Sequence, residues 1–465
     1  MVKLSPMMWG MPAALLLVCA QLPLAEEGAR EGKSAESPVN LHGIANWEVG
    51  QIEEGFSAKK GGRVDREFLN RASVWLWSDV TLSEHAKATL GVGGVYFFVF
   101  PRNLGDNPYT FTRRSGMGIT EASLDVNLVP NFGEGELARI KAGIFMYKSN
   151  PDTKNLGEYM FRTWTYPNVI TTGGVDIIDN TATQLSGLQL SSSQGGFKND
   201  VLLTIQSDRP PIYGLSLTDM ISYNIGGFLK VGVGYMWDNF YVPEKGGKEP
   251  KIKEANSIYT LSNGRKISYS KFIDEKNSGL VADSQVVDTS YNSFEGQKAV
   301  WMTSLDLGRI LGFETEGTLP STFGLYYEGV LMGIENRTTY FEKRNQRIAH
   351  MFGMNIPTFG ALDLLSFEVE KTSNPYRNST AGVLTEGSIT PPVSNFSDPA
   401  QVNYTRDDVK WSVLAKKKIY PKATLMLQVA NDHLRTLSVF SEWEYLDMMQ
   451  QPDHWYWACK MQFSL

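Results

Sequence analysis

The chain has 465 residues, of which 44 are basic and 50 acidic, so its net charge at pH 7 is −6. This acidic balance offers no electrostatic attraction for nucleic acid and excludes a nucleic-acid partner. The cysteines are Cys19 and Cys459. Only Cys459 remains once an N-terminal leader is removed, so the mature chain forms no intrachain disulfide.

The first 25 residues have the pattern of a secretory signal. Lys3 supplies the positive start, residues 11–18 are apolar, and residues 22–25 end on a small residue. Pro12 and Pro23 interrupt the apolar stretch, which is therefore too short to span a bilayer as a helix, because a span needs about 20 apolar residues. The sequence predicts that residues 1–25 are removed on export, which brings the net charge to about −7.

The mature chain, residues 26–465, is expected to form one domain, because no linker or change of composition divides it. It contains no second apolar run of about 18 residues, which excludes helical membrane spans. Its 43 glycines, 20 tyrosines and 11 tryptophans suit strands, tight turns and a membrane interface. A membrane signal in this chain must therefore lie in the periodicity of strands.

The segments on either side of Asn131 show this periodicity most clearly. Polar and apolar residues alternate without exception from residue 121 to 128, and again from 138 to 146, with a short turn between them. A strand in a barrel wall shows one face to lipid and the other to a polar lumen, which produces this period of two. The two segments are predicted to form a hairpin with one apolar face.

The same alternation recurs along the chain in segments of about 10 residues, the length that a tilted membrane strand needs. The connections alternate between short and long, and the longest are residues 149–181, 241–296 and 372–405. We predict an all-β, transmembrane, antiparallel up-and-down barrel of about 16 strands, with short periplasmic turns and long external loops. The predicted strands are 39–49, 73–82, 87–98, 121–128, 138–146, 183–191, 199–206, 215–224, 229–238, 299–307, 322–332, 347–356, 362–370, 408–416, 423–431 and 455–465.

The last eleven residues resemble the C-terminal strand by which outer-membrane barrels are recognised by their assembly machinery. One face of this segment is apolar and the other mostly polar. In that family the final residue is usually Phe or Trp, whereas this chain ends on Leu465, with Phe463 two residues before it. The residues of the expected assembly signal are Trp457, Met461, Phe463 and Leu465.

Taken as a whole, the mature chain resembles the porin class of outer-membrane proteins of Gram-negative-type bacteria. The resemblance lies in strand number, alternating turns and loops, the leader and the C-terminal pattern, and it identifies no subfamily. It implies a water-filled pore, often narrowed by the third external loop, and often a homotrimer. It also implies outer-membrane lipid, lipopolysaccharide and the barrel assembly machinery as partners.

Charged residues on the predicted inward faces are the candidate pore lining, because water in a lumen can solvate them. Acidic and basic residues gather on different strands, and such arcs would set a transverse field that selects among ions. Ordinary cross-strand pairing, for example Asp125 with Arg139 or Lys141, is the alternative, and both roles are compatible. The candidates are Glu121, Asp125, Arg139, Lys141, Asp306, Glu328, Glu368, Glu370, Lys410, Lys416 and Lys460.

The third external loop, residues 149–181, is long enough to fold back into the barrel and is the candidate constriction. Its aromatic residues could stack on sugar rings, or they could pack against the wall. The segment 241–296 is an equally long rival. The candidate constriction residues are Asp152, Glu158, Tyr159, Arg162, Trp164, Tyr166 and Asp176.

The sequence predicts a passive channel for small hydrophilic solutes or ions. A structural or adhesive barrel that binds a surface through its loops is the alternative, and a saccharide-preferring channel is a further one. No enzymatic role is expected, because the chain lacks the His-Glu-x-x-His, Gly-x-Ser-x-Gly and phosphate-loop motifs. The acid and histidine pairs Asp432-His433 and Asp453-His454 would point to opposite faces of a strand. No metal or cofactor is expected.

Overall fold

The computed structural model describes residues 39–57, 62–99, 115–129, 138–148, 150, 183–205, 214–241, 257–291, 296–312, 323–331, 334, 344–372, 409–431, 449 and 451–465. By its internal contacts the chain divides into residues 1–38 and residues 39–465. The predicted leader, 1–25, lies outside the described residues, as does nearly all of the predicted constriction loop, 149–181. Within the described part of the chain, no helix has the length and apolar character needed to cross a membrane.

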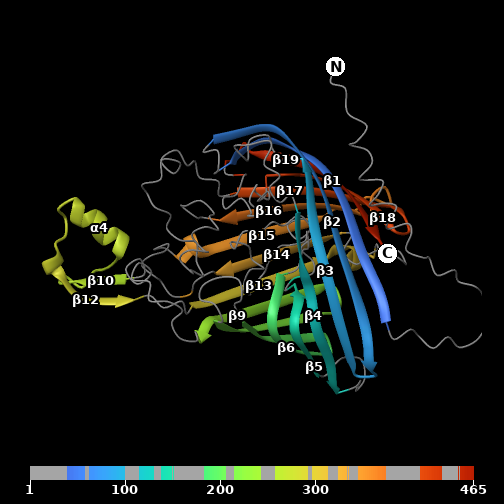
Figure 1. Ribbon diagram of the computed structural model, residues 1–465, viewed down its shortest axis with the longest axis horizontal. Helices are drawn as coiled ribbons and strands as arrows, with labels where there is room; N and C mark the ends of the chain where they lie inside the picture. The colour runs from blue at the N-terminus through green and yellow to red at the C-terminus, as the bar shows by residue number, and fades with distance from the viewer. Residues whose placement is uncertain are drawn as a thin grey trace, which may run out of the picture. The chain divides into compact units, whose positions relative to one another are not determined.

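Sixteen strands form one closed antiparallel barrel (Figure 1). Fifteen of the sixteen strand pairings join barrel strands that are successive along the chain. In the sixteenth, β1 pairs with β19 and closes the ring. The strands are β1 Val39–Ser57, β2 Gly62–Ser83, β3 Ala86–Val99, β4 Ser115–Val129, β5 Ala138–Tyr147, β6 Thr183–Gln194, β7 Phe197–Ile205, β8 Leu215–Ile225, β9 Leu229–Tyr241, β13 Gly296–Asp306, β14 Gly324–Leu331, β15 Ile348–Asn355, β16 Leu364–Thr372, β17 Val409–Tyr420, β18 Ala423–Ala430 and β19 Trp455–Ser464.

The prediction of an all-β up-and-down barrel is confirmed, and each of the sixteen predicted strands corresponds to a strand of the ring. The largest differences are at the first two strands, which have 19 and 22 residues and are longer than their alternating segments suggested. Residues 50–57 and 62–72 continue the pairing of β1 with β2 beyond the predicted ends. When a barrel strand is longer than a bilayer requires, it extends the barrel wall beyond its apolar band.

The hairpin of β4 and β5 shows how the alternation sets the register. Asp125 lies opposite Lys141, and Ala122 lies opposite Ile144. Because side chains point alternately to the two faces, this register places all polar positions on one side of the wall. At Gly143 the backbone φ is +118°, and a Cβ atom there would lie 2.2 Å from the carbonyl oxygen of Ala122, so glycine permits this approach of β4 and β5.

The two faces of the wall have opposite characters. Large apolar side chains are exposed on the outward face, including Leu41, Trp47, Leu90, Leu124, Leu188, Val233, Phe352, Phe367 and Leu427. Charged side chains are buried on the inward face, including Glu48, Arg71, Glu121, Asp125, Asp200, Lys298, Glu328, Glu368, Lys410 and Lys460. A soluble protein buries apolar groups and exposes charged ones, so this reversed distribution fits a wall that stands in lipid.

The segment between β9 and β13, predicted as a long loop, contains a small fold of its own. Its sheet has the order β11-β10-β12, with bounds Ser257–Leu261 for β10, Lys266–Ser268 for β11 and Val286–Tyr291 for β12. Between β11 and β12 lie the helix α4, Tyr269–Asn277, and the turn η2, Asp283–Gln285. Leu261, Ile267, Phe272 and Val281 form its buried core. These strands of three to six residues are too short to show a clear alternation in the sequence.

Two further short helical elements occur in the connections of the barrel. The helix α5, Leu307–Leu311, follows β13, and the turn η3, Arg344–Arg347, precedes β15. The amide of Arg309 donates to the carboxylate of Asp306, which caps α5 at its N-terminus.

Candidate functional site

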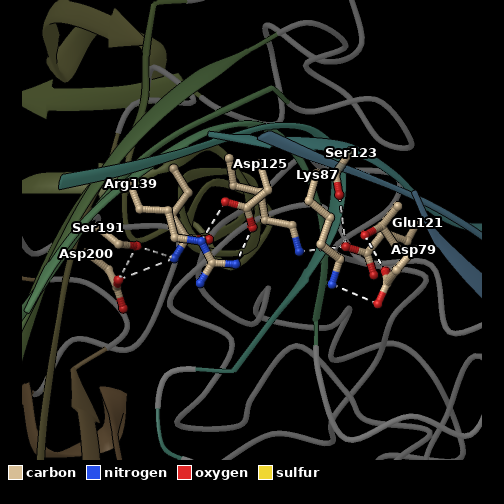
Figure 2. A network of polar contacts seen from close by, with 11 residues as sticks. Asp79, Lys87, Glu121, Ser123, Asp125, Arg139, Ser191 and Asp200 are labelled. Atoms are coloured by element: carbon tan, nitrogen blue, oxygen red, sulfur yellow. Dashed lines mark hydrogen bonds and ion pairs between the residues drawn. The ribbon is translucent and has the colours of Figure 1, made fainter. Parts of the chain in front are cut away.

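The inward faces of β4 and β5 carry two of the predicted acidic residues and two of the predicted basic residues in direct contact (Figure 2). Lys141 Nζ lies 2.6 Å from Glu121 Oε1, and Arg139 Nε donates to Asp125 Oδ1 over 2.6 Å. Ser123, between the two acids, donates to Glu121 over 2.9 Å. These four predicted charges therefore form cross-strand ion pairs, which is the pairing alternative that the sequence left open.

The paired charges continue onto neighbouring strands, where sequence reasoning did not find them. Lys87 Nζ of β3 lies 2.7 Å from Asp79 Oδ2 of β2, and Thr89 donates to the same carboxylate. On β7, Asp200 accepts from Ser191 over 2.7 Å and lies 3.0 Å from Lys198 Nζ. The inward alternation could have identified all of them. We call the set the charge ladder; its members are Asp79, Lys87, Glu121, Asp125, Arg139, Lys141, Lys198 and Asp200. Figure 2 labels all of them except the lysines at 141 and 198.

A second group of predicted residues, which we call the acidic patch, consists of Glu328, Glu368 and Glu370 on β14 and β16. All three side chains are at most 1% exposed. Glu370 lies opposite Lys410 of β17 in the sheet register. The hydroxyl of Tyr326 donates to Glu368 and lies 3.1 Å from the hydroxyl of Ser366. The register therefore brings the three predicted acids and one predicted lysine to adjoining positions of the inner wall.

The predicted bases Lys416 and Lys460 also lie on inward positions, but in different surroundings. Lys416 is opposite Leu364 and Met426 in the register. Lys460 is opposite Glu48 of β1, across the seam that closes the barrel. Sequence reasoning missed the buried pair at this seam, in which Arg71 donates to both oxygens of Glu48 over 2.9 Å. Two donors on one carboxylate make a bidentate pair, the strongest geometry for such contacts.

Asp306 differs from the other predicted pore residues because its carboxylate has a local structural partner. It ends β13 and accepts the amide hydrogen of Arg309 over 2.9 Å. A side chain that caps a helix in this way satisfies a backbone donor that would otherwise have no partner in the helix. The cap gives this acid a local structural role, and its role in the pore lining stays a prediction.

The inner wall is not polar throughout, in contrast to the simple alternation of the sequence. A cluster of buried apolar side chains lies on inward positions of β5 to β9 and β13 to β15. Glycines within it leave room for these side chains: a Cβ atom on Gly234 would lie 2.1 Å from the sulfur of Met220. Its members are Phe145, Tyr147, Leu185, Leu202, Met220, Met236, Val300, Met302, Val330 and Ala349.

The predicted assembly residues lie on the outward side of the closing strand. Trp457, Met461 and Phe463 alternate with the buried Tyr456, Ala458 and Lys460 of β19. The amide of Leu465 donates to the carbonyl oxygen of Gly43 over 2.9 Å, so the last residue is held on β1 at the seam. Recognition of this strand by an assembly machinery stays a prediction.

The residues predicted for the constriction loop, from Asp152 to Asp176, lie outside the described residues. Across the part of the chain that is described, no group of three or more His, Cys, Asp or Glu side chains is arranged to hold a metal ion.

No protein-family model and no curated protein matches this chain. Among solved structures, OprB of Pseudomonas putida at high pH matches with 9% identity and a TM-score of 0.49, covering 92% of this chain and 94% of that chain. A triple mutant of the Rhodopseudomonas blastica porin matches with 7% identity and a TM-score of 0.43, covering 92% of this chain and all of that chain.

Both likenesses are distant, with TM-scores below 0.5 and identities below 10%. The closed antiparallel ring of sixteen strands is itself the architecture that the sequence suggested. The fold is an all-β, antiparallel up-and-down barrel.

Proposed function

We propose that this protein is an outer-membrane channel for the passive diffusion of small hydrophilic solutes or ions. The single observation that carries the proposal is the reversed distribution of side chains in a closed barrel, apolar outside and charged inside. Charged groups at membrane depth are tolerated where water or a counter-charge solvates them, and they are typical of solute pathways. The proposed surroundings are outer-membrane lipid and lipopolysaccharide, reached by export through the predicted leader.

Conductance of the purified, folded protein in a planar bilayer tests this proposal. We expect discrete open steps of the size that a water-filled pore produces. A folded barrel, shown by heat-modifiable migration on a gel, that inserts and stays silent would contradict a channel. Recovery of the native protein in the outer-membrane fraction tests the proposed location separately.

The charged inner wall leads to a further expectation about ion selectivity. Lys141 and Lys410 are inward cations on opposite arcs of the wall, beside Glu121 and Glu370 respectively. Changing both to Glu should shift the reversal potential toward cation preference, because rings of charge select among ions. Lys271→Glu on α4, which is not part of the barrel ring, is the matched control. An unchanged reversal potential would mean that the two lysines only brace the wall.

A structural or adhesive barrel is the second candidate, and one observation favours it. Several inward side chains, including Phe145, Leu185 and Leu202, are fully buried, although an open lumen would leave them accessible to water. In this alternative the small fold between β9 and β13 would bind a surface or partner. The conductance experiment separates the two candidates, since a blocked barrel carries no current.

Saccharide preference and assembly as a homotrimer remain proposals that rest on the sequence resemblance. Block of the ionic current by a maltooligosaccharide series would test the first. Cross-linking of the native protein in its membrane would test the second.

A further inference from the structure

Met449 belongs to the connection between β18 and β19, yet it lies against the inner wall of the barrel. It is fully buried and forms one apolar cluster with Ile52, Leu69, Ala430 and Tyr456. Those four side chains occupy inward positions on β1, β2, β18 and β19. A residue that packs among four inward side chains must itself lie on the lumen side of the wall.

The backbone of Met449 is also held at this place. Lys410, an inward residue of β17 that is 5% exposed, donates from Nζ to the carbonyl oxygen of Met449. A buried carbonyl without such a donor would lose the free energy of its hydrogen bonds to water. The contact therefore fastens the chain to β17 by a charge-assisted hydrogen bond, in addition to the apolar packing.

Described residues at both ends of the connection between β18 and β19 have backbone hydrogen bonds. At the end of β18, the amide of Asn431 donates to the carbonyl oxygen of Trp411 of β17, and the amide of Trp411 donates to Asn431 Oδ1. Just before β19, the amide of His454 donates to the carbonyl oxygen of Gln451. Met449 itself is held by its apolar cluster and by Lys410.

We propose that Met449, fastened by Lys410, is a constriction of the pore on the arc formed by β17, β18, β19, β1 and β2. This inference rests on the proposed channel function and names the residue that narrows the channel. A methionine suits the place because its unbranched, flexible side chain fills irregular gaps between other apolar groups. The constriction therefore lies in the last connection of the barrel, whereas the sequence resemblance pointed to the third external loop.

The first experiment tests the position of Met449 without any current measurement. Met449→Cys is combined with Leu69→Cys in a Cys19→Ser/Cys459→Ser background of the full chain, and the folded barrel is treated with a short bifunctional thiol reagent. We expect a cross-link, seen as altered migration after denaturation. The control pair Met449→Cys with Leu202→Cys should not cross-link, because β7 is five strands away from β2 around the ring. A folded barrel that cross-links only in the control pair, or in neither pair, overturns the inference.

The second experiment tests the effect of Met449 on the current. Met449→Gly should give a higher single-channel conductance than the parent protein, and Met449→Ser is the second variant if the first does not fold. Met461→Gly is the matched control, because Met461 lies on the outward side of β19 and should leave the conductance unchanged. Heat-modifiable migration checks that each variant is folded.

The outcomes separate this inference from the proposed function. A conducting parent with unchanged conductance in both Met449 variants overturns the constriction and leaves the channel intact. A silent parent that conducts after the Met449 change supports a constriction that is closed in the parent. A barrel that is silent with and without Met449 overturns both the constriction and the channel.

Discussion

The outward and inward faces of β8 and β9 illustrate two different rules within one wall. On the outward face the side chains at alternate positions, such as Leu217, Ile221 and Val233, are apolar. On the inward face Thr218, Met220 and Ser222 follow one another without a common character. In the proposed membrane setting the outward face meets one apolar solvent, so a single property suffices at nearly every position. Each inward side chain instead meets particular neighbours, and its identity depends on them.

Asp219 is an exception on the outward face of β8, near the middle of the strand. Its carboxylate accepts from Asn199 Nδ2 of β7 over 2.5 Å. Tyr235 of β9 lies opposite it on the other side. A carboxylate costs less than a lysine or arginine on the lipid face, and a hydrogen bond from a neighbouring strand reduces the cost further.

The largest expected effect comes from adding one positive charge to each face of β6. Leu188 is 48% exposed on the outward side, and Gln189 points inward and donates to Asp200 over 3.2 Å. Leu188→Arg should lower the free energy of unfolding by about 2 to 4 kcal/mol, the cost of arginine on a lipid face at the midplane. Gln189→Arg should be tolerated, because Asp200 can accept from the new guanidinium.

Equilibrium unfolding by urea in lipid vesicles measures both variants against the parent. Equal losses for Leu188→Arg and Gln189→Arg would show that the two faces do not differ in their surroundings.

A smaller effect is expected when glycines beside aromatic rings are replaced. A Cβ atom on inward Gly353 would lie 1.9 Å from the ring of Tyr326, and one on outward Gly329 would lie 2.4 Å from the ring of Trp301. Gly353→Ala should cost about 1 to 3 kcal/mol, the usual cost of overpacking, because Tyr326 is buried and bonded to Glu368. Gly329→Ala should cost less, because Trp301 is only half-buried and loses one hydrogen bond, from its Nε1 to the hydroxyl of Tyr327, when its ring turns away.

The same unfolding experiment compares these two alanine variants. A larger loss for Gly329→Ala than for Gly353→Ala would indicate that the outward ring is the more tightly held of the two.

The smallest effect concerns one carboxylate on each face. Inward Asp200 accepts from Ser191 and lies beside Lys198, so Asp200→Asn should cost about 1 kcal/mol through weaker hydrogen bonds and the lost ion pair. Asp219→Asn should leave the stability unchanged or raise it slightly, because it removes a charge from the lipid face. A marked loss of stability for Asp219→Asn alone would show that the outward carboxylate has a partner beyond Asn199.

Much of the candidate site could be predicted because it follows from the same alternation as the strands. Glu121, Asp125, Arg139 and Lys141 were placed on inward faces from the sequence, and the structure adds that they form pairs. The pair of Arg71 with Glu48 was not predicted, because it joins β2 to β1 across a register that sequence reasoning did not establish. The cap that Asp306 forms on α5 could not be predicted, because a five-residue helix in a turn leaves the alternation that precedes it unchanged.

By itself, the sequence predicted about sixteen barrel strands, their approximate bounds and which side of each is apolar, because an alternation with a period of two is a local property. Only the tertiary structure decided which charges meet, where the inner wall becomes apolar, and that Met449 enters the barrel beside Lys410. The segment between β9 and β13 likewise acquired its own core. These features depend on contacts between residues far apart in the chain, and such contacts are set by strand register and closure of the ring.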